Sequence, residues 1–168
     1  MRLVATSPIP GSPLVNVKAI LSPEDVARAC ADAMWKDDDA SRGLGMKIVE
    51  IKPGQATLTM TVQPHMVNGQ RIAHGGFIFT LADSAFAFAC NSHNERAVAA
   101  QGNITFIRPG KLGDVLVATA REISRSGRSG LYDVRVTAGG AVIAEFRGHS
   151  RTIGGTWLPE PETDSKKK

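Results

Sequence analysis

Hydrophobic positions divide the chain into two helical segments and several strand-like segments. The first helical pattern begins at Ser22, a favourable N-cap residue, and Pro23 follows at a position where proline is accepted. Apolar residues then recur at helical spacing on one face, namely Val26, Ala29, Cys30, Ala33 and Met34. The acidic run at residues 37–39 is unfavourable in a last helical turn, so we expect this helix to end there.

The strand-like segments are marked by alternating apolar residues and by turn residues between them. Residues 46–52 and 55–63 flank Pro53-Gly54, and this pattern predicts a hairpin. Further strands are predicted at residues 97–107, 115–123, 131–138 and 142–153. Short turn segments separate them, including residues 126–130 and the strong hairpin signal Gly139-Gly140.

The segment from residue 75 to residue 91 differs from the rest because it has no polar face. A helix that is apolar all round is buried on all sides, and this one is too short to cross a bilayer. The order of elements therefore predicts an α+β domain whose antiparallel sheet curls around one long buried helix, with an additional N-terminal helix. Such a sheet leaves a face or an edge exposed, which a second copy of the chain is expected to cover.

One carboxylate interrupts the apolar helix. Asp83 lies in the middle of this helix, among apolar residues that include Ala82 and Ala85. An unpaired carboxylate in such surroundings is unfavourable by several kcal/mol. Either a buried ion pair or a loop contact offsets this cost, or the carboxylate is kept for chemistry. We favour the second interpretation and regard Asp83 as the principal catalytic candidate.

A second candidate feature is His74-Gly75-Gly76, directly before the helix. Glycines let the backbone approach a ligand closely, and a helix start offers free N–H groups that can bind the oxyanion of an acyl carbonyl. Asp83 lies eight residues beyond Gly75, which is about 12 Å along a helix axis. Because one carbonyl cannot touch both groups of the same helix, we predict a site at a dimer interface, with one group from each subunit.

Four segments form a combined motif, namely Asn68-Gly69-x-x-x-x-His74-Gly75-Gly76, the run from Leu81 to Asn91, Ile104-Thr105-Phe106-x-Arg108-Pro109-Gly110 and Phe146-Arg147-Gly148. Together they resemble the PaaI-type phenylacetate-degradation thioesterases of the hotdog superfamily. The resemblance covers about residues 22–155, and the combined motif is more specific than the His-Gly-Gly triplet alone.

The resemblance implies a hotdog fold and an acyl-CoA thioesterase that releases CoA from aryl-acyl or related thioesters, such as phenylacetyl-CoA or hydroxyphenylacetyl-CoA. It makes Asp83 the nucleophile or general base and the Gly75 N–H the group that polarises the carbonyl. Asn68 is expected to orient the water or the thioester, and His74 to contact the sulfur region or to fix the loop. The resemblance further implies homodimers that pair into homotetramers, and no metal or redox cofactor beyond the CoA of the substrate.

Candidate substrate-binding residues are less specific. Gly76 offers a second backbone N–H, and arginines suit the phosphates of CoA, although turn arginines are often merely solvated. The arginine candidates are Arg108, Arg125 and Arg128. Some related thioesterases carry a water-positioning serine on the strand after the helix. This chain has Ala99, Ala100 and Gln101 there, which leaves the water-positioning role unassigned, with Gln101 as a candidate.

Two other functions remain open at this stage. Hotdog folds also support enoyl-CoA hydratases and dehydratases. That chemistry normally pairs an aspartate with a histidine on a loop just beyond it, whereas His93 lies about ten residues after Asp83. The other alternative is an acyl-CoA-binding protein without catalysis. The histidines have no metal-ligand spacing, and Cys90 has no adjacent base that would make it a nucleophile.

Composition and charge set the remaining expectations. The 168 residues carry a formal net charge of +4, to which the lysines at 166–168 contribute. No helix carries a basic stripe, so nucleic-acid binding is not expected. We expect a flexible arm at residues 1–21, one domain at 22–157 and a flexible basic tail at 158–168. Without a secretory signal or a membrane span, a cytoplasmic protein is predicted.

Overall fold

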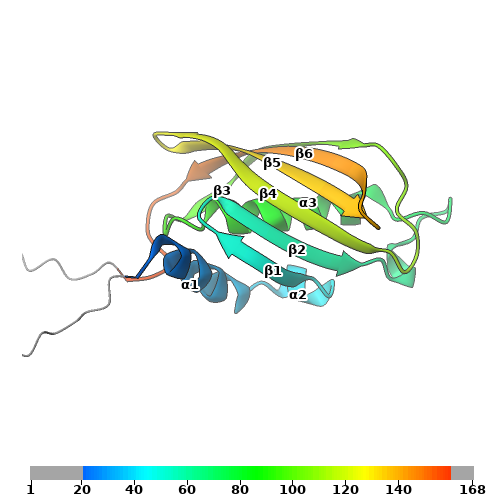
Figure 1. The fold of residues 1–168 in the computed structure, drawn as a ribbon, viewed down its shortest axis with the longest axis horizontal. Helices are drawn as coiled ribbons and strands as arrows, with labels where there is room; N and C mark the ends of the chain where they lie inside the picture. Colours follow the sequence, from blue (N-terminus) through cyan, green and yellow to red (C-terminus); the bar gives the residue numbers. More distant parts are fainter. Residues whose placement is uncertain (1–20, 160–168) are drawn as a thin grey trace, which may run out of the picture.

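A six-stranded antiparallel sheet wraps around one long helix, α3 (Gly75–Cys90), in a computed structural model that describes residues 21–159 (Figure 1). The strand order is β1-β2-β4-β5-β6-β3, and every neighbouring pair is antiparallel. The strands are β1 (Lys47–Lys52), β2 (Gln55–Thr61), β3 (Ala97–Phe106), β4 (Val115–Ser126), β5 (Ser129–Ala138) and β6 (Ala141–Thr152). The predicted α+β architecture is confirmed; nearly all of the expected arm and tail lies outside the described residues.

The N-terminal helix α1 (Pro23–Trp35) begins as predicted, with a reciprocal cap. The Ser22 hydroxyl accepts the N–H of Asp25 at 3.1 Å, and the Asp25 carboxylate accepts the N–H of Ser22 at 3.3 Å. The acidic run at residues 37–39 also contains the start of a second helix. The Asp38 carboxylate accepts the N–H of Ser41 at 2.9 Å and caps a second short helix, α2 (Asp39–Gly43), which the sequence pattern did not reveal.

The hairpin turns contain glycines with positive φ values. The two central residues of the β5–β6 turn, Gly139 and Gly140, have φ values of +54° and +80°, so the predicted tight turn is confirmed. The segment 126–130 was wrongly expected to be a longer connection. Strand β4 continues to Ser126 and β5 begins at Ser129, which leaves a turn at Gly127 and Arg128. A 3-10 turn, η1 (Pro64–Met66), begins the long connection from β2 to α3.

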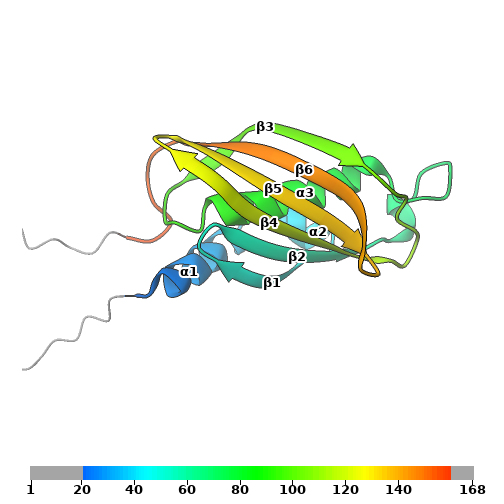
Figure 2. The same cartoon turned by 45° about the horizontal axis from the view of Figure 1, so that its top comes forward.

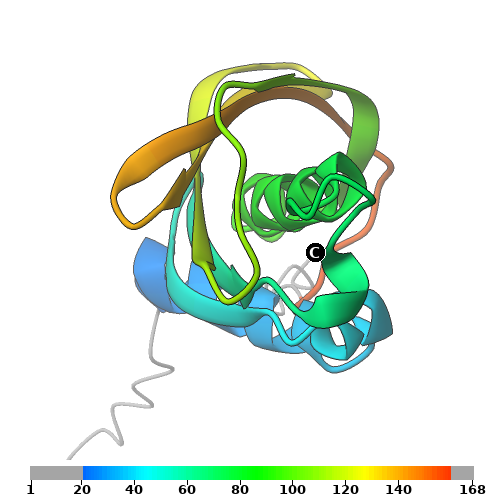
Figure 3. The ribbon, with the colours of Figure 1, turned by 90° about the vertical axis from the view of Figure 1, so that its right-hand side faces the viewer.

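Helix α3 supplies the core of the domain, as Figure 3 shows in a view close to the helix axis. Its side chains Leu81, Phe86 and Phe88 are almost fully buried beneath the sheet. Burial on all sides was predicted, but a stripe of this helix stays half-buried: Phe79, Thr80, Asp83 and Ala87. The sheet of one chain therefore covers the stripe that contains Asp83 only in part.

Strand β3 forms one edge of the sheet, because it pairs with β6 alone (Figure 2). The opposite edge strand, β1, packs against α1. Large apolar side chains near the β3 edge are exposed, with Val98 at 47%, Phe106 at 51% and Ile107 at 50%. An open apolar edge of this kind is a place where a further strand can pair. No helix within residues 21–159 is long and apolar enough to cross a membrane.

A single buried amide joins the end of α3 to β3 and to the C-terminal segment. The Asn91 Nδ2 group donates to the carbonyls of Ala87 at 2.9 Å and Ala97 at 3.0 Å. Its Oδ1 accepts the N–H of Ala97 at 2.9 Å and the indole N–H of Trp157 at 2.8 Å. Asn91 is 2% exposed, so this amide fixes the position at which the chain leaves α3 and enters β3.

Candidate active site

The start of α3 presents one free backbone donor. His74 is the N-cap residue, and its Nδ1 accepts the N–H of Gly76 at 3.0 Å. The Gly75 N–H has no acceptor among the described residues, as expected for the first residue of a helix. The predicted donor at Gly75 is therefore available. The N–H of Gly76, which we expected to contact substrate, is occupied by His74 instead.

The loop before the helix is held by Asn68. Its Oδ1 accepts the N–H groups of Gln70 at 2.9 Å and Ile72 at 3.4 Å, and its own N–H donates to the Ile72 carbonyl at 2.9 Å. These bonds stabilise a tight loop in which Arg71 has a φ of +64°. The Asn68 Nδ2 group has no partner within the described part of the chain, so it remains free to donate to a ligand.

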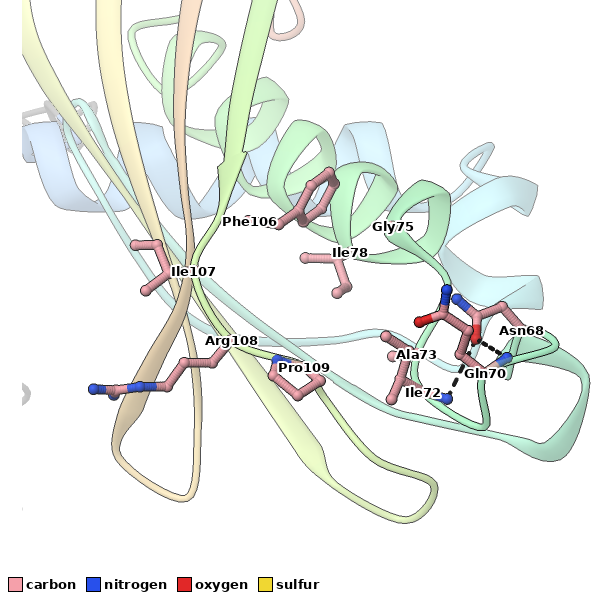
Figure 4. A pocket seen from close by; sticks show the side chains of 10 residues that line it. All are labelled: Asn68, Gln70, Ile72, Ala73, Gly75, Ile78, Phe106, Ile107, Arg108 and Pro109. Carbon is pink, nitrogen blue, oxygen red and sulfur yellow. Dashed lines mark hydrogen bonds between the residues drawn. The ribbon is translucent and has the colours of Figure 1, made fainter.

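An open cavity of about 540 Å³ brings Gly75 and Asn68 together (Figure 4). Its volume lies in the range of small-molecule sites, roughly 300–1,000 Å³. Most of its other lining residues are apolar. The lining comprises Asn68, Gln70, Ile72, Ala73, Gly75, Ile78, Phe106, Ile107, Arg108 and Pro109. Arg108 belongs to the lining as predicted, and Figure 4 shows its guanidinium extended away from Gly75. The cavity therefore combines free polar donors with apolar walls.

Asp83 has no hydrogen bond or ion pair with any described residue. Its side chain is half-buried, and desolvation raises the pKa of its carboxyl above the ordinary value. The alternative of an internal ion pair is therefore excluded within residues 21–159. Asp83 is also absent from the lining of the Gly75 cavity, which agrees with the separation expected along one helix.

The other predicted ligand contacts lie away from this cavity in the same chain. Arg125 donates to Glu95 at 2.8 Å, and Arg128 donates to the carbonyl of Thr152 at 2.8 Å and 3.1 Å. The strand registers put both arginines at the β4–β5 turn, where β3 begins, whereas Arg108 follows the end of β3. One chain therefore does not bring the three arginines together.

Gln101 does not face Asp83. It lies opposite His149 on β6, whereas its neighbours Gly102 and Ile104 lie on the face that packs against α3. Because side chains alternate along a strand, Gln101 points to the outer face of the sheet. The proposal that it positions the attacking water has no support from this geometry.

Sequence reasoning missed most of the apolar lining, including Ile78, Phe106 and Pro109. The motif around Phe106 was noticed as a family signature, but nothing in the pattern placed its ring beside Gly75. No cluster of three or more histidine, cysteine or acidic side chains suited to a metal ion occurs among the described residues.

Comparisons with known proteins identify the family of this chain. Residues 70–144 match the family model described as the thioesterase superfamily. The chain is 45% identical to the acyl-coenzyme A thioesterase PaaI of Escherichia coli, over 75% of this chain and 91% of that protein. The structure of the E. coli PaaI protein from the phenylacetic acid degradation operon has a TM-score of 0.79 and 43% identity, covering 80% of this chain and 99% of that one.

A Streptococcus mutans protein bound to acetyl CoA has a TM-score of 0.64 and 28% identity, over 66% of this chain and 90% of that one. The range matched by the family model includes helix α3 and strands β3 to β5. The chain therefore belongs to the thioesterase superfamily, as a PaaI-type member with the hotdog fold.

Proposed function

We propose that this protein is an acyl-CoA thioesterase that hydrolyses aryl-acyl or related acyl-CoA thioesters to the free acid and CoA. The observation that carries the proposal is a free Gly75 N–H in a ligand-sized cavity, together with an unpaired, partly desolvated carboxylate at Asp83. The E. coli relative named as an acyl-coenzyme A thioesterase supports the reaction, and its phenylacetic acid degradation operon supports an aryl-acyl substrate such as phenylacetyl-CoA or hydroxyphenylacetyl-CoA.

In the proposed reaction, the thioester carbonyl oxygen accepts the Gly75 N–H, which stabilises the negative charge that develops on that oxygen. Asp83 then acts in one of two ways. As a general base it takes a proton from a water molecule that attacks the carbonyl carbon, and that proton passes to the departing CoA sulfur. As a nucleophile its oxygen attacks the same carbon and displaces CoA, and water then cleaves the resulting anhydride.

Oxygen labelling can identify the nucleophilic route. In a single turnover with excess enzyme in H₂¹⁸O, direct attack by water on the thioester puts the label into the released acid. After nucleophilic attack by Asp83, water that opens the anhydride at the aspartyl carbonyl leaves ¹⁸O on Asp83, whereas opening at the acyl carbonyl labels the acid; ¹⁸O on Asp83 is therefore the diagnostic result. Mass spectrometry of the acid and of the peptide that contains Asp83 provides the measurement.

The two groups would meet between subunits. The half-buried stripe of α3 contains Asp83, and the open, partly apolar edge of β3 offers a place for an antiparallel β3–β3 contact with a second copy. Such a two-fold contact would bring the middle of one α3 toward the start of the other. We therefore propose a homodimer in which each site uses Gly75 of one subunit and Asp83 of its partner, and dimers that pair into a homotetramer.

Asn68 and His74 are proposed to assist. The free Nδ2 group of Asn68 shares the cavity with Gly75 and can donate to the thioester or to the attacking water. His74 already accepts the Gly76 N–H. This bond favours a role in fixing the loop, rather than a contact with the thioester sulfur. Arg108 at the cavity rim is proposed to bind a CoA phosphate, and Arg125 and Arg128 could contribute only from another subunit.

Replacing Asp83 tests the proposal directly. We expect Asp83→Ala to reduce thiol release from phenylacetyl-CoA by about 10²–10⁴-fold, the usual contribution of acid–base catalysis. Asp37→Ala, which changes an exposed aspartate outside the site, is the matched control and should retain wild-type rates. Circular dichroism and light scattering would check that fold and assembly survive. Equal rates for Asp83→Ala and the wild type would refute the assignment.

Thiol release, measured beside acyl-CoA binding and consumption of an enoyl-CoA, separates the alternatives. A binding protein without catalysis would bind acyl-CoA but release no thiol, in the wild type as in Asp83→Asn. A hydratase would consume the enoyl-CoA chromophore without releasing thiol. The structure gives the hydratase alternative little support, because the Nε2 of His93 lies 2.8 Å from Glu122 and not beside Asp83.

A further inference from the structure

Phe106 forms part of the Gly75 cavity, and none of the roles above uses it. It ends strand β3, is 51% exposed and is one of the residues that line the cavity. The tip of its ring lies against the first residue of α3: a Cβ placed on Gly75 would be 2.8 Å from the ring Cζ. Real carbon atoms do not approach so closely, so the ring in this position requires a glycine at residue 75.

Phe106 is also the one aromatic side chain in the cavity lining. Two other phenylalanines that could have bound an aryl group, Phe86 and Phe88, are fully buried in the core. Phe77 packs edge-on against His74, with ring centroids 6.3 Å apart. An aromatic contact with a ligand in this cavity therefore falls to Phe106.

We propose that Phe106 is a specificity-determining residue that forms the wall against the acyl group and favours aryl over straight-chain acyl groups. This inference rests on the proposed thioesterase function. A carbonyl oxygen bound to the Gly75 N–H fixes the acyl carbon next to Gly75, and the ring of Phe106 touches that same residue. An aryl group one or two bonds from the carbonyl can then pack against the ring, while Ile78 and Pro109 supply further apolar wall.

The test compares two substrates in wild type and Phe106→Leu, which keeps an apolar side chain but removes the ring. The measurement is kcat/KM for phenylacetyl-CoA divided by kcat/KM for hexanoyl-CoA. Since aromatic pairs gain about 0.5–1.5 kcal/mol beyond their buried area, we expect this ratio to fall by roughly 2- to 12-fold. Ile123→Leu, at a similarly exposed residue outside the cavity, is the control and should leave the ratio unchanged.

The outcomes separate this inference from the function on which it rests. If Phe106→Leu slows both substrates equally, the ring supports the site without reading the acyl group, and the inference is overturned while the thioesterase function stands. If the wild type hydrolyses neither ester, the proposed function fails. Calorimetric titration of wild type and Phe106→Leu with both esters then decides the inference, and an unchanged affinity ratio overturns it.

A second variant tests the contact itself. Gly75→Ala keeps the backbone N–H but puts a methyl group where the ring tip lies, so we expect it to displace the ring and lower the phenylacetyl-CoA preference. Leucine at residue 106 ends short of the ring tip, so Gly75→Ala combined with Phe106→Leu should show no further fall beyond Phe106→Leu alone. A fall that is additive in the double variant would contradict the inference.

Discussion

The surroundings of Asp83 determine how strong a base its carboxylate is. Desolvation raises the pKa of its carboxyl, and no cation among the described residues offsets that effect. A raised pKa makes a carboxylate a stronger base than an exposed one, provided that it is ionised at the working pH. The same desolvation makes the ionised form unfavourable for folding, so activity and stability depend on this residue in opposite directions.

We predict an acidic limb in the pH dependence of kcat/KM, with an apparent pKa above 3.8, the ordinary value for an aspartate. Activity should rise with pH through that limb, because the ionised carboxylate is the reactive form.

Asp83→Asn should remove the charge that folding desolvates, so at neutral pH its free energy of unfolding should exceed that of the wild type. This difference should shrink as pH falls toward 3.8, because the wild-type carboxyl is then protonated in the folded state. A less stable Asp83→Asn at neutral pH would contradict this account.

His74 allows its two proposed roles to be separated. His74→Ala should lower the free energy of unfolding by about 1 kcal/mol, because the Gly76 N–H loses its cap. His74→Asn can still cap the helix but cannot act as an imidazole. If His74 fixes the loop, the asparagine variant should recover both stability and thiol release, measured by urea unfolding and by the thioesterase assay. Recovery of stability alone would show that the imidazole contacts the reacting ester.

At the scale of elements, local signals predicted local structure well. Ser22 and Pro23 predicted the start of α1, and Gly139-Gly140 predicted a tight hairpin, because such preferences depend on neighbouring residues. Helix α2 escaped notice because five residues are too few to show a period. The contact between Phe106 and Gly75 joins residues far apart in the sequence, and no single sequence reveals such a pair. The prediction that the apolar helix is buried on all sides was too strong, because its own sheet covers only part of its surface.

The junction between α3 and β3 depends on Asn91. Asn91→Ala would leave the Ala97 N–H and the Trp157 indole N–H without their acceptor, and we expect a loss of about 1–3 kcal/mol in the free energy of unfolding. Gln101→Ala removes an amide from the exposed outer face of β3 and serves as the matched control. Urea unfolding of both variants provides the comparison. Equal destabilisation would show that the Asn91 network contributes no more than an exposed amide.

At the scale of the whole molecule, the outer face of the sheet differs from the open β3 edge and the half-buried stripe of α3. The outer face carries paired charges, with Arg147 2.6 Å from Asp133 and Arg135 2.8 Å from Glu145. These groups are compatible with water. The open β3 edge instead combines exposed apolar side chains with unpaired backbone groups, and the half-buried stripe of α3 contains Phe79 and Ala87 beside Asp83. A second copy is therefore expected at the edge, in preference to the charged face.

Mixing two inactive variants tests whether a site is shared. A chain with Asp83→Asn and a chain with Gly75→Pro, in which the first residue of α3 has no N–H, each lack one group, but a mixed dimer regains one intact site. After unfolding and refolding an equimolar mixture, we expect roughly one quarter of wild-type activity, because half of the dimers are mixed and each has one of its two sites intact. If both groups acted within one chain, the mixture would stay as inactive as its components. Each homodimer refolded alone is the control.

The half-buried stripe of α3 has a consequence for how much protein is needed. If half of every site belongs to a neighbouring chain, a lone chain has no complete site, however well it folds. Turnover per molecule would then fall on dilution below the dissociation constant of the pair, and the rate would grow faster than in proportion to protein amount. The abundance of this protein in its host would thereby act as a threshold for its activity.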